Sequence, residues 1–263
     1  MRRLLPLIAV AALAAGCGHS PRSSSPPVGT HSSTVVTTTA PSTTTLPNSR
    51  GQVLGRVYFL RDGKVAPVAR PLSPPTVATG ALEQLAAGPS DAEQADGLTS
   101  GAPSAPPGLT VAGGVATVDA ANVSHTGLAQ IVYTLTQFPS VQGVRASRML
   151  GDAKPLTRAD FEDMTPAILV ESPLPGAAVT SPLRVYGAAN TFEATFDLEI
   201  RNSSGVKIAW RFVTASSGSG TRGTYDTTIS FPHTGGPLTL VAYEPSAENG
   251  KPLHVVRIPL REG

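Results

Sequence analysis

Residues 128–139 predict the helix around which the first half of the chain folds; they read Leu128-Ala129-Gln130-Ile131-Val132-Tyr133-Thr134-Leu135-Thr136-Gln137-Phe138-Pro139. The larger apolar residues recur at i, i+3, i+4, i+7 and i+10, so they share one face of a helix, and Pro139 ends it. A helix with a single apolar stripe is stable only when that stripe is buried against another layer. The sequence on either side must therefore supply a sheet.

Short strands are predicted on both sides of this helix. Asp62-Gly63 is a strong turn signal between two β-type runs, and Gly113-Gly114 separates another such pair. A first helix is expected between Pro74-Pro75 and Gly88-Pro89, and a short one after a variant capping box at Thr157. The predicted strands are 53–60, 64–70, 109–112, 115–120 and 141–150, with a polar loop over 90–107. The order β-β-α-β-β-α-β predicts an α+β domain with helices on one face of the sheet.

The second half of the chain predicts an all-β domain. Apolar residues alternate with polar ones over residues 192–200 and again over 206–212, with an Asn-Ser-Ser-Gly turn between them. The other predicted strands are 168–171, 183–187, 225–231, 237–243 and 253–260. Seven short strands separated by turn signals are typical of an immunoglobulin-like sandwich. Because the chain has one cysteine, which precedes this domain, Trp210 and the phenylalanines are expected to fill the core without a disulfide.

The N-terminus predicts a lipoprotein leader. Arg2 and Arg3 precede an apolar run over residues 4–15, which is shorter than the roughly 20 residues of a membrane-spanning helix. Leu13-Ala14-Ala15-Gly16-Cys17 resembles a lipobox and ends in the chain's single cysteine, which cannot form an internal disulfide. We expect cleavage before Cys17 and lipid on its sulfur. An ordinary secretory signal with an incidental cysteine is the alternative.

Residues 17–50 are predicted to be a disordered tether. From Gly18 to Arg50 the sequence has sixteen Ser and Thr, five Pro and two charged residues, so apolar burial cannot offset the entropy of folding. A flexible segment of this length reaches roughly 30 Å, and its Ser/Thr runs are typical of O-glycosylated stretches. The predicted organisation is a signal peptide over 1–16, the tether over 17–50, the α+β domain over 51–164 and the sandwich over 167–263, outside the cytoplasm and lipid-anchored to the cell membrane.

Charge argues against a nucleic-acid partner. The formal net charge of the chain is +2, and removing Arg2 and Arg3 with the leader makes the mature part formally neutral. A neutral protein lacks the electrostatic footprint that nucleic-acid binding requires.

The first folded domain resembles the GerMN domain of sporulation and germination proteins and of some actinobacterial lipoproteins. The resemblance is carried by Val57-Tyr58-Phe59, by residues 67–70, 81–89 and 114–119, and above all by residues 129–139. The second domain resembles the immunoglobulin-like domain of bacterial spore germination, through residues 172–176, 181–183 and 187–194. The resemblance implies ring-building or assembly modules in envelope processes, with no established catalytic residues.

No catalytic residue, cofactor site or metal site is predicted. Gly218-Ser219-Gly220-Thr221-Arg222-Gly223 matches a dinucleotide fingerprint as a string, but a strand is expected after it instead of a helix, so we expect a flexible hairpin loop. Ser204-Gly205-Val206-Lys207 matches an S-x-x-K string but spans a turn and a strand. The five histidines lack metal-ligand spacing, with His125 expected at a helix start. Asp160, Glu162 and Asp163 are expected on a solvated helix face.

Aromatic residues of the sandwich could form a carbohydrate-stacking platform. Phe196, Trp210 and Phe212 alternate with polar residues, which favours burial in the core. Tyr186, Phe192 and Tyr243 are less constrained and could border a binding surface, although packing is favoured for them too.

The sequence therefore favours a non-enzymatic, membrane-anchored envelope lipoprotein that acts as an assembly or interaction module. Its expected partners are the membrane, through the lipid, and an envelope protein or a second copy of itself. A peptidoglycan- or glycan-binding protein is the alternative, and a cell-wall hydrolase is a third hypothesis.

Overall fold

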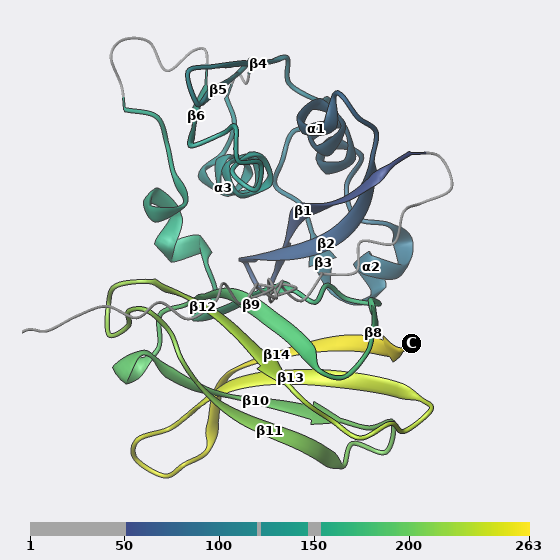
Figure 1. Cartoon of the computed structure of the whole chain (residues 1–263). Helices are drawn as coiled ribbons and strands as arrows, with labels where there is room; N and C mark the ends of the chain where they lie inside the picture. The colour runs from purple at the N-terminus through teal and green to yellow at the C-terminus, as the bar shows by residue number, and fades with distance from the viewer. Residues whose placement is uncertain (1–50, 120–121, 147–153) are drawn as a thin grey trace, which may run out of the picture. The chain divides into compact units, whose positions relative to one another are not determined.

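The computed structural model describes residues 51–119, 122–146 and 154–263 (Figure 1). The predicted leader, Cys17 and the tether lie outside the described residues, as do residues 147–150 of the predicted strand over 141–150. All described residues belong to one compact unit, which contains two separate clusters of buried apolar side chains. Each cluster is the core of one domain.

The first domain packs helices against two small sheets. One sheet has the order β2-β1-β3, and the other has the order β4-β5-β6 with β5 and β6 parallel. The elements are β1 (Val53–Arg61), β2 (Lys64–Leu72), α1 (Val77–Ala87), α2 (Asp91–Ala95), β3 (Leu98–Thr99), β4 (Leu109–Ala112), β5 (Val115–Val118), α3 (His125–Leu135), β6 (Gly143–Ala146) and the 3-10 segment η1 (Arg158–Met164). The predicted α+β class is confirmed, and α2 and β3 occupy part of the stretch predicted as a loop.

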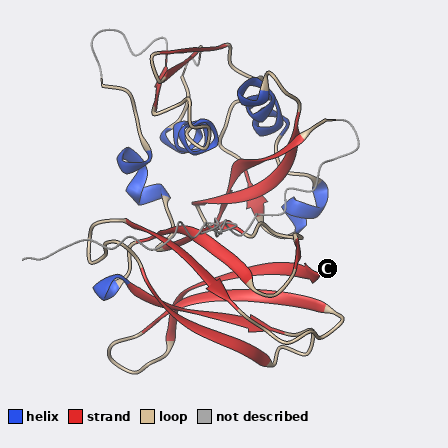
Figure 2. Ribbon diagram, viewed as in Figure 1, coloured by secondary structure: helices blue, strands red, loops and turns tan. Residues whose placement is uncertain are grey.

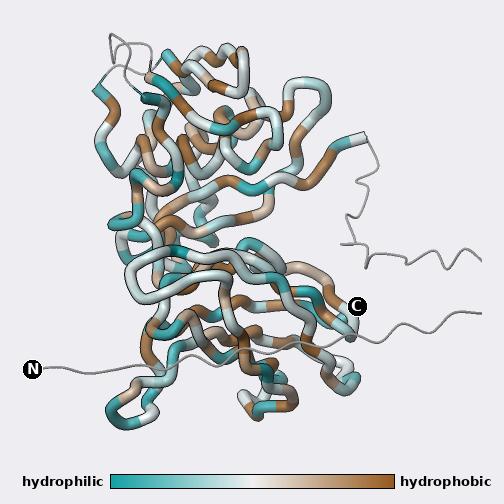
Figure 3. Tube along the Cα trace, turned by 60° about the vertical axis from the view of Figure 1, so that its left-hand side comes forward, coloured by the Kyte–Doolittle hydropathy of each residue, from teal (hydrophilic) through white to brown (hydrophobic). Residues whose placement is uncertain are grey.

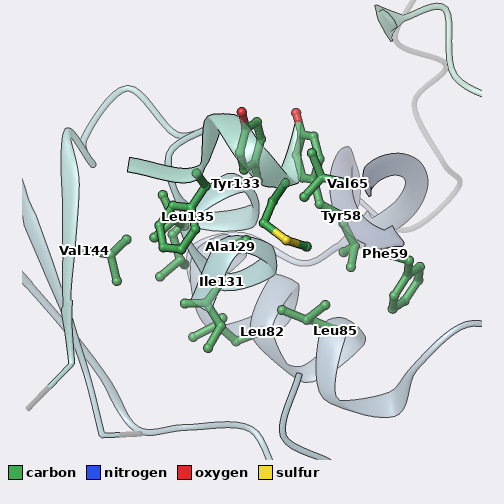
Figure 4. Packing of buried hydrophobic residues seen from close by; sticks show 14 of the residues in the cluster. Tyr58, Phe59, Val65, Leu82, Leu85, Ala129, Ile131, Tyr133, Leu135 and Val144 are labelled. Atoms are coloured by element: carbon green, nitrogen blue, oxygen red, sulfur yellow. The ribbon is translucent and has the colours of Figure 1, made fainter. Parts of the chain in front are cut away.

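Helix α3 is the predicted central helix. Ser124 caps its start by accepting a hydrogen bond from the Gly127 nitrogen at 3.1 Å, as capping residues do. Ile131 and Leu135 on its apolar face are fully buried. The rings of Tyr58 and Tyr133 lie 5.3 Å apart, and their hydroxyls point the same way, away from Leu82 and Leu85 of α1 (Figure 4). The apolar core thus ends in two hydroxyl groups on one side.

Polar side chains of α3 and of the turn after it satisfy the backbone of β1. The Gln130 amide donates to the Tyr58 carbonyl at 3.0 Å, and Thr134 accepts from the Tyr58 nitrogen at 3.2 Å. Gln137 accepts from the Arg56 nitrogen at 2.7 Å. Gln130 and Thr134 are four residues apart and share one face of α3, and Gln137 follows two residues after the helix ends. They replace the hydrogen bonds that a neighbouring strand would make to this part of β1, which otherwise would be buried without partners.

The second domain is a sandwich of two mainly antiparallel sheets (Figure 2). One sheet has the order β12-β9-β7 and the other the order β11-β10-β13-β14-β8, in which short β8 pairs parallel with β14. Apolar and polar residues alternate along these strands (Figure 3). The elements are β7 (Ile168–Ser172), β8 (Ala178–Val179), β9 (Leu183–Ala189), the 3-10 turn η2 (Phe192–Ala194), β10 (Thr195–Arg201), β11 (Lys207–Thr214), β12 (Gly223–Ile229), β13 (Pro237–Pro245) and β14 (Pro252–Glu262).

The start of β10 differs from the prediction. Residues 192–194 were expected to continue the strand, but they form η2, and Glu193 and Ala194 have φ of 54° and 60°. Backbone in this left-handed region is strained for residues other than glycine. Phe192 is consequently turned out and is 59% exposed.

A partly buried ion pair joins the two domains. Arg158 of η1 donates to the Glu171 carboxylate of β7 at 2.8 Å, and the Tyr58 hydroxyl donates to the same oxygen. The Arg158 guanidinium also lies over the Tyr133 ring, 4.7 Å from its centroid. The Tyr58 hydroxyl at the end of the first core therefore meets a carboxylate of the second domain. The Tyr133 hydroxyl instead contacts the Thr165 hydroxyl at 2.5 Å.

A second set of contacts lies beside the first. Glu162 of η1 accepts hydrogen bonds from Arg222 at 2.8 Å and from Asn190 at 2.8 Å. Arg56 of β1 donates to the Tyr186 hydroxyl of β9 at 2.8 Å. The prediction that Glu162 lies on a purely solvated helix face is wrong, because its carboxylate is part of the domain junction. Tyr186, which the sequence placed beside a possible binding surface, is part of the junction too.

The junction holds Glu171 in its charged form. Burial acts to raise the pKa of Glu171, but the charge of Arg158 and the hydrogen bond from Tyr58 outweigh burial and keep the pKa below the ordinary carboxyl value. A carboxyl group with a lowered pKa stabilises the folded state above its unfolded pKa, about 4.3. That contribution is lost as the pH falls through the folded pKa.

We predict that Glu171→Gln lowers the free energy of unfolding at pH 7 by roughly 2–3 kcal/mol. This is below the cost of breaking a fully buried ion pair, because 27% of the Arg158 side chain is exposed. The difference from the wild type should shrink as the pH falls below about 4. Urea denaturation of the full chain in detergent at pH 7 and pH 3.5 measures it.

Asp226→Asn is the matched control, because Asp226 pairs with Arg184 at a site where both side chains are more than a third exposed. It should change the free energy of unfolding by about 0.5 kcal/mol or less. Equal effects of the two substitutions, or an effect of Glu171→Gln that does not depend on pH, would contradict the assignment.

Candidate functional site

The strand β11 turns two large aromatic side chains outward. Trp210 and Phe212 are each 54% exposed, whereas Phe196 is fully buried. The prediction that all three fill the core is therefore right for Phe196 and wrong for the other two. On β11 the residues packed against the core are Ile208, Ala209 and Val213. Both faces of this strand carry apolar residues, and shifting the strand by one residue exchanges the faces, so the pattern alone could not choose between them.

The outward side chains of the neighbouring strand are charged. Across the sheet, Trp210 stands opposite Glu199 and Phe212 stands opposite Asp197 of β10. Glu199 accepts hydrogen bonds from Arg201 at 2.6 Å and from the Tyr243 hydroxyl at 2.9 Å, and Lys207 lies 3.3 Å from it. We call this set of outward side chains the aromatic face; it comprises Asp197, Glu199, Arg201, Lys207, Trp210, Phe212, Val241, Tyr243 and Arg257.

Glu199 is the electrostatic centre of the aromatic face. Only 2% of the residue is exposed, although it points away from the core. Burial acts to raise its pKa, but the hydrogen bonds from Arg201, Tyr243 and Lys207 outweigh burial and lower the pKa below the ordinary value. Burial and the hydrogen bond to Glu199 in turn raise the pKa of Tyr243 to about 12. At neutral pH Glu199 is ionised, Tyr243 is protonated, and the carboxylate fixes the position of Arg201.

A shallow hollow lies at the other side of the aromatic face. Its volume is about 290 Å³, and its lining includes Arg201, Val241, Tyr243 and Arg257. Arg257 is exposed, and no described side chain or carbonyl accepts a hydrogen bond from it. The hollow therefore presents one paired and one unpaired arginine.

Two larger hollows, of about 460 and 590 Å³, lie where the first domain meets the sandwich. Their linings are mostly apolar, from β1, β2, β7 and β14. Three charged groups in the linings already have partners: Glu93 pairs with Arg70, Glu171 pairs with Arg158, and Arg56 donates to the Tyr186 hydroxyl. We regard these hollows as seams of the domain junction, and the aromatic face as the candidate site.

The glycine-rich string at residues 218–223 has a structural explanation. It connects β11 to β12, which belong to different sheets, so the expected hairpin loop is instead a crossover between the sheets. A Cβ on Gly218 would lie 2.4 Å from the Ala194 nitrogen, and one on Gly223 would lie 2.2 Å from the Ser217 nitrogen. Glycine is required there because backbone segments approach closely. A strand follows the string, so the arrangement for binding a pyrophosphate is absent at this position.

The other sequence candidates are separated in the structure. Lys207 of the S-x-x-K string pairs with Glu199. His125 is the first residue of α3, as predicted, and contacts Asp163 at 2.9 Å, with both side chains more than half exposed. Within residues 51–119, 122–146 and 154–263, no group of three or more His, Cys, Asp or Glu could hold a metal ion. In the same ranges, none of the helices has the length and hydropathy needed to cross a bilayer.

Comparisons with known families match each domain separately. Residues 56–146 match the family described as sporulation and spore germination, and residues 167–251 match the immunoglobulin-like domain of bacterial spore germination. A comparison with curated proteins gave no significant match.

One similar solved structure contains the tandem GerMN domains of the sporulation protein GerM from Bacillus subtilis, at 15% sequence identity and a TM-score of 0.35. The match covers 68% of this chain and 61% of that chain. At this TM-score the likeness adds nothing to the assignment of the fold. The two family matches assign the domains: the chain carries a sporulation and spore germination domain followed by an immunoglobulin-like domain of bacterial spore germination, and is a germination-associated module.

Proposed function

We propose that this germination-associated module is a lipid-anchored protein of the cell envelope that acts by binding an envelope component, and that the aromatic face is its contact surface. The families matched by both domains are modules of sporulation and germination and are not known as enzymes, which supports binding over catalysis. The lipobox-like stretch ending in Cys17 supports the anchor.

The exposure of Trp210 and Phe212 carries this proposal. Each ring is more than half exposed, and an aromatic side chain buries about 150–250 Å² when fully covered. Covering the exposed parts of both rings would contribute on the order of 5 kcal/mol at about 25 cal/mol per Å². Adjacent exposed aromatic residues on one strand are a feature of interaction surfaces.

The domain junction supports the same proposal. The Arg158–Glu171 pair and the Glu162–Arg222 pair link the first domain to the sandwich. The aromatic face is therefore presented by a body of two joined domains. A lipid anchor on a flexible tether would hold that body near the membrane and raise its effective concentration for a weakly bound partner.

We predict that Cys17→Ser releases the protein from the membrane. Without the thiol, no lipid can be attached, and a short apolar leader gives no stable anchoring by itself. Fractionation of cells that express the full chain measures this, with intact mass of the wild type reporting the lipid. A wild-type protein with an unmodified Cys17 in the soluble fraction would contradict the anchor.

We place a photo-cross-linker at Thr214, an exposed residue of the same strand. We predict that the double variant Trp210→Ala/Phe212→Ala lowers the yield of cross-linked adducts at least five-fold. The adducts are measured in intact envelopes, both as protein bands and as label retained on the wall. Phe192→Ala is the matched control, because Phe192 is equally exposed but lies in η2, off the strands of the aromatic face.

If the wild type forms neither protein adducts nor wall adducts, or if Phe192→Ala lowers the adduct yield equally, the aromatic face is not the contact surface. Thermal unfolding of each variant checks that the sandwich remains folded.

A further inference from the structure

We propose that the aromatic face binds a carboxylate-bearing glycan, with peptidoglycan as its source, laid across the strands from Trp210 to Arg257. The inference rests on the proposed function in one respect: it uses the same contact surface. It adds the chemical class of the ligand and the role of each end of the surface.

The first support is a row of side chains that crosses the sheet. Trp210 stands opposite Glu199, Glu199 opposite Val241, and Val241 opposite Arg257. Adjacent strands lie about 4.8 Å apart, so the row from β11 to β14 is about 14 Å long. Figure 1 shows these strands, β11, β10, β13 and β14, in one sheet. That length suits an oligosaccharide better than a single sugar.

The aromatic end of the row suits the apolar side of sugar rings. Trp210 and Phe212 are two residues apart on one strand, about 7 Å, and both are 54% exposed. The C–H groups on one side of a pyranose carry a slight positive charge, and the face of an aromatic ring is negative. Two neighbouring rings of this kind can hold consecutive sugars while the sugar hydroxyls stay at the edges.

The charges beside the aromatic rings favour a polar ligand over a protein. The cores of protein interfaces are depleted of charged residues, whereas Asp197 and Glu199 stand directly opposite Phe212 and Trp210. Asp197 is partly exposed and can accept hydrogen bonds from hydroxyls, which a glycan supplies in number. The buried oxygens of Glu199 are already bonded to Arg201, Tyr243 and Lys207. Arg201 is already held by Glu199 through two hydrogen bonds, at 2.9 and 2.6 Å. A side chain held in place before binding loses less entropy when the ligand arrives.

The other end of the row has a cation without an anion. Arg201 and Lys207 both pair with Glu199, and Asp197 adds a second carboxylate on the face. Arg257 lines the 290 Å³ hollow and has no polar partner among the described residues. A guanidinium is well matched to a carboxylate, which it binds through two parallel hydrogen bonds. The charge that complements this end is therefore a carboxylate of the glycan or of the peptide attached to it.

The chain contains its own reporter for this interaction, because Trp210 is its only tryptophan. We titrate the purified full chain, in detergent, with soluble muropeptides and with neutral N-acetylglucosamine oligomers of matched length, and record tryptophan emission. We expect the muropeptides to shift the emission and to bind at least ten-fold more tightly than the neutral oligomers. Arg257→Ala should weaken muropeptide binding about ten-fold and leave binding of the neutral oligomers unchanged.

Arg211→Ala is the matched control, since Arg211 is an exposed arginine of β11 that donates to Thr227 at 2.8 Å and stands on the opposite face of the strand. It should leave both affinities unchanged. Co-sedimentation with purified sacculi, stripped of protein and of teichoic acid, gives a second readout without fluorescence. Trp210→Ala/Phe212→Ala should abolish this co-sedimentation while circular dichroism stays native.

Unchanged emission together with no co-sedimentation would overturn the glycan inference, and so would equal binding of neutral and carboxylated probes that Arg257→Ala does not alter. If the envelope adducts at Thr214 still depend on Trp210 and Phe212 in that case, the contact surface stands and its ligand is a protein. If the glycan does not bind and the adducts at Thr214 do not depend on Trp210 and Phe212, the contact surface is overturned as well.

Discussion

The ion pair between Arg158 and Glu171 is the interaction on which the rest of the structure depends. Each domain has its own apolar core, but the first core ends in the hydroxyls of Tyr58 and Tyr133, which need polar partners when buried. Glu171 supplies one of them and Arg158 covers both rings. Each domain thus supplies polar partners for groups at the end of the other domain's core. Separation of the domains would leave a guanidinium and a carboxylate without their partners.

The aromatic face also follows from the way each domain fills its own core. Phe196, Leu198 and Ile200 of β10 pack into the core of the sandwich. The larger rings on β11 lie outside this core. Trp210 and Phe212 are left outward, beside a carboxylate that burial and three donors keep fixed. A surface of this kind combines apolar planes with charges of set position, which is the combination expected for recognition of an amphipathic ligand.

Much of the fold could be predicted from local patterns, and the candidate site could not. The period of α3, the Asp62-Gly63 turn and the alternation on β10 each have a single physical solution, and the predicted elements there are close to those observed. The burial of β11 was predicted wrongly because both of its faces are apolar. The role of Glu162 depends on Arg222, sixty residues away, and no local pattern reports such a contact. A signal was available for Gln130 and Thr134, since polar residues at i and i+4 on a buried helix require a partner.

The position of β11 at the end of its sheet has a further consequence. An edge strand offers a row of free backbone groups, and one that also shows aromatic rings invites another chain to add itself as a new strand. Lys207 and Arg211 on the same strand oppose this, because two approaching copies would bring like charges together and would have to strip water from them. The protein can therefore expose aromatic side chains on the face of the sheet while its edge strand resists the addition of further chains as strands.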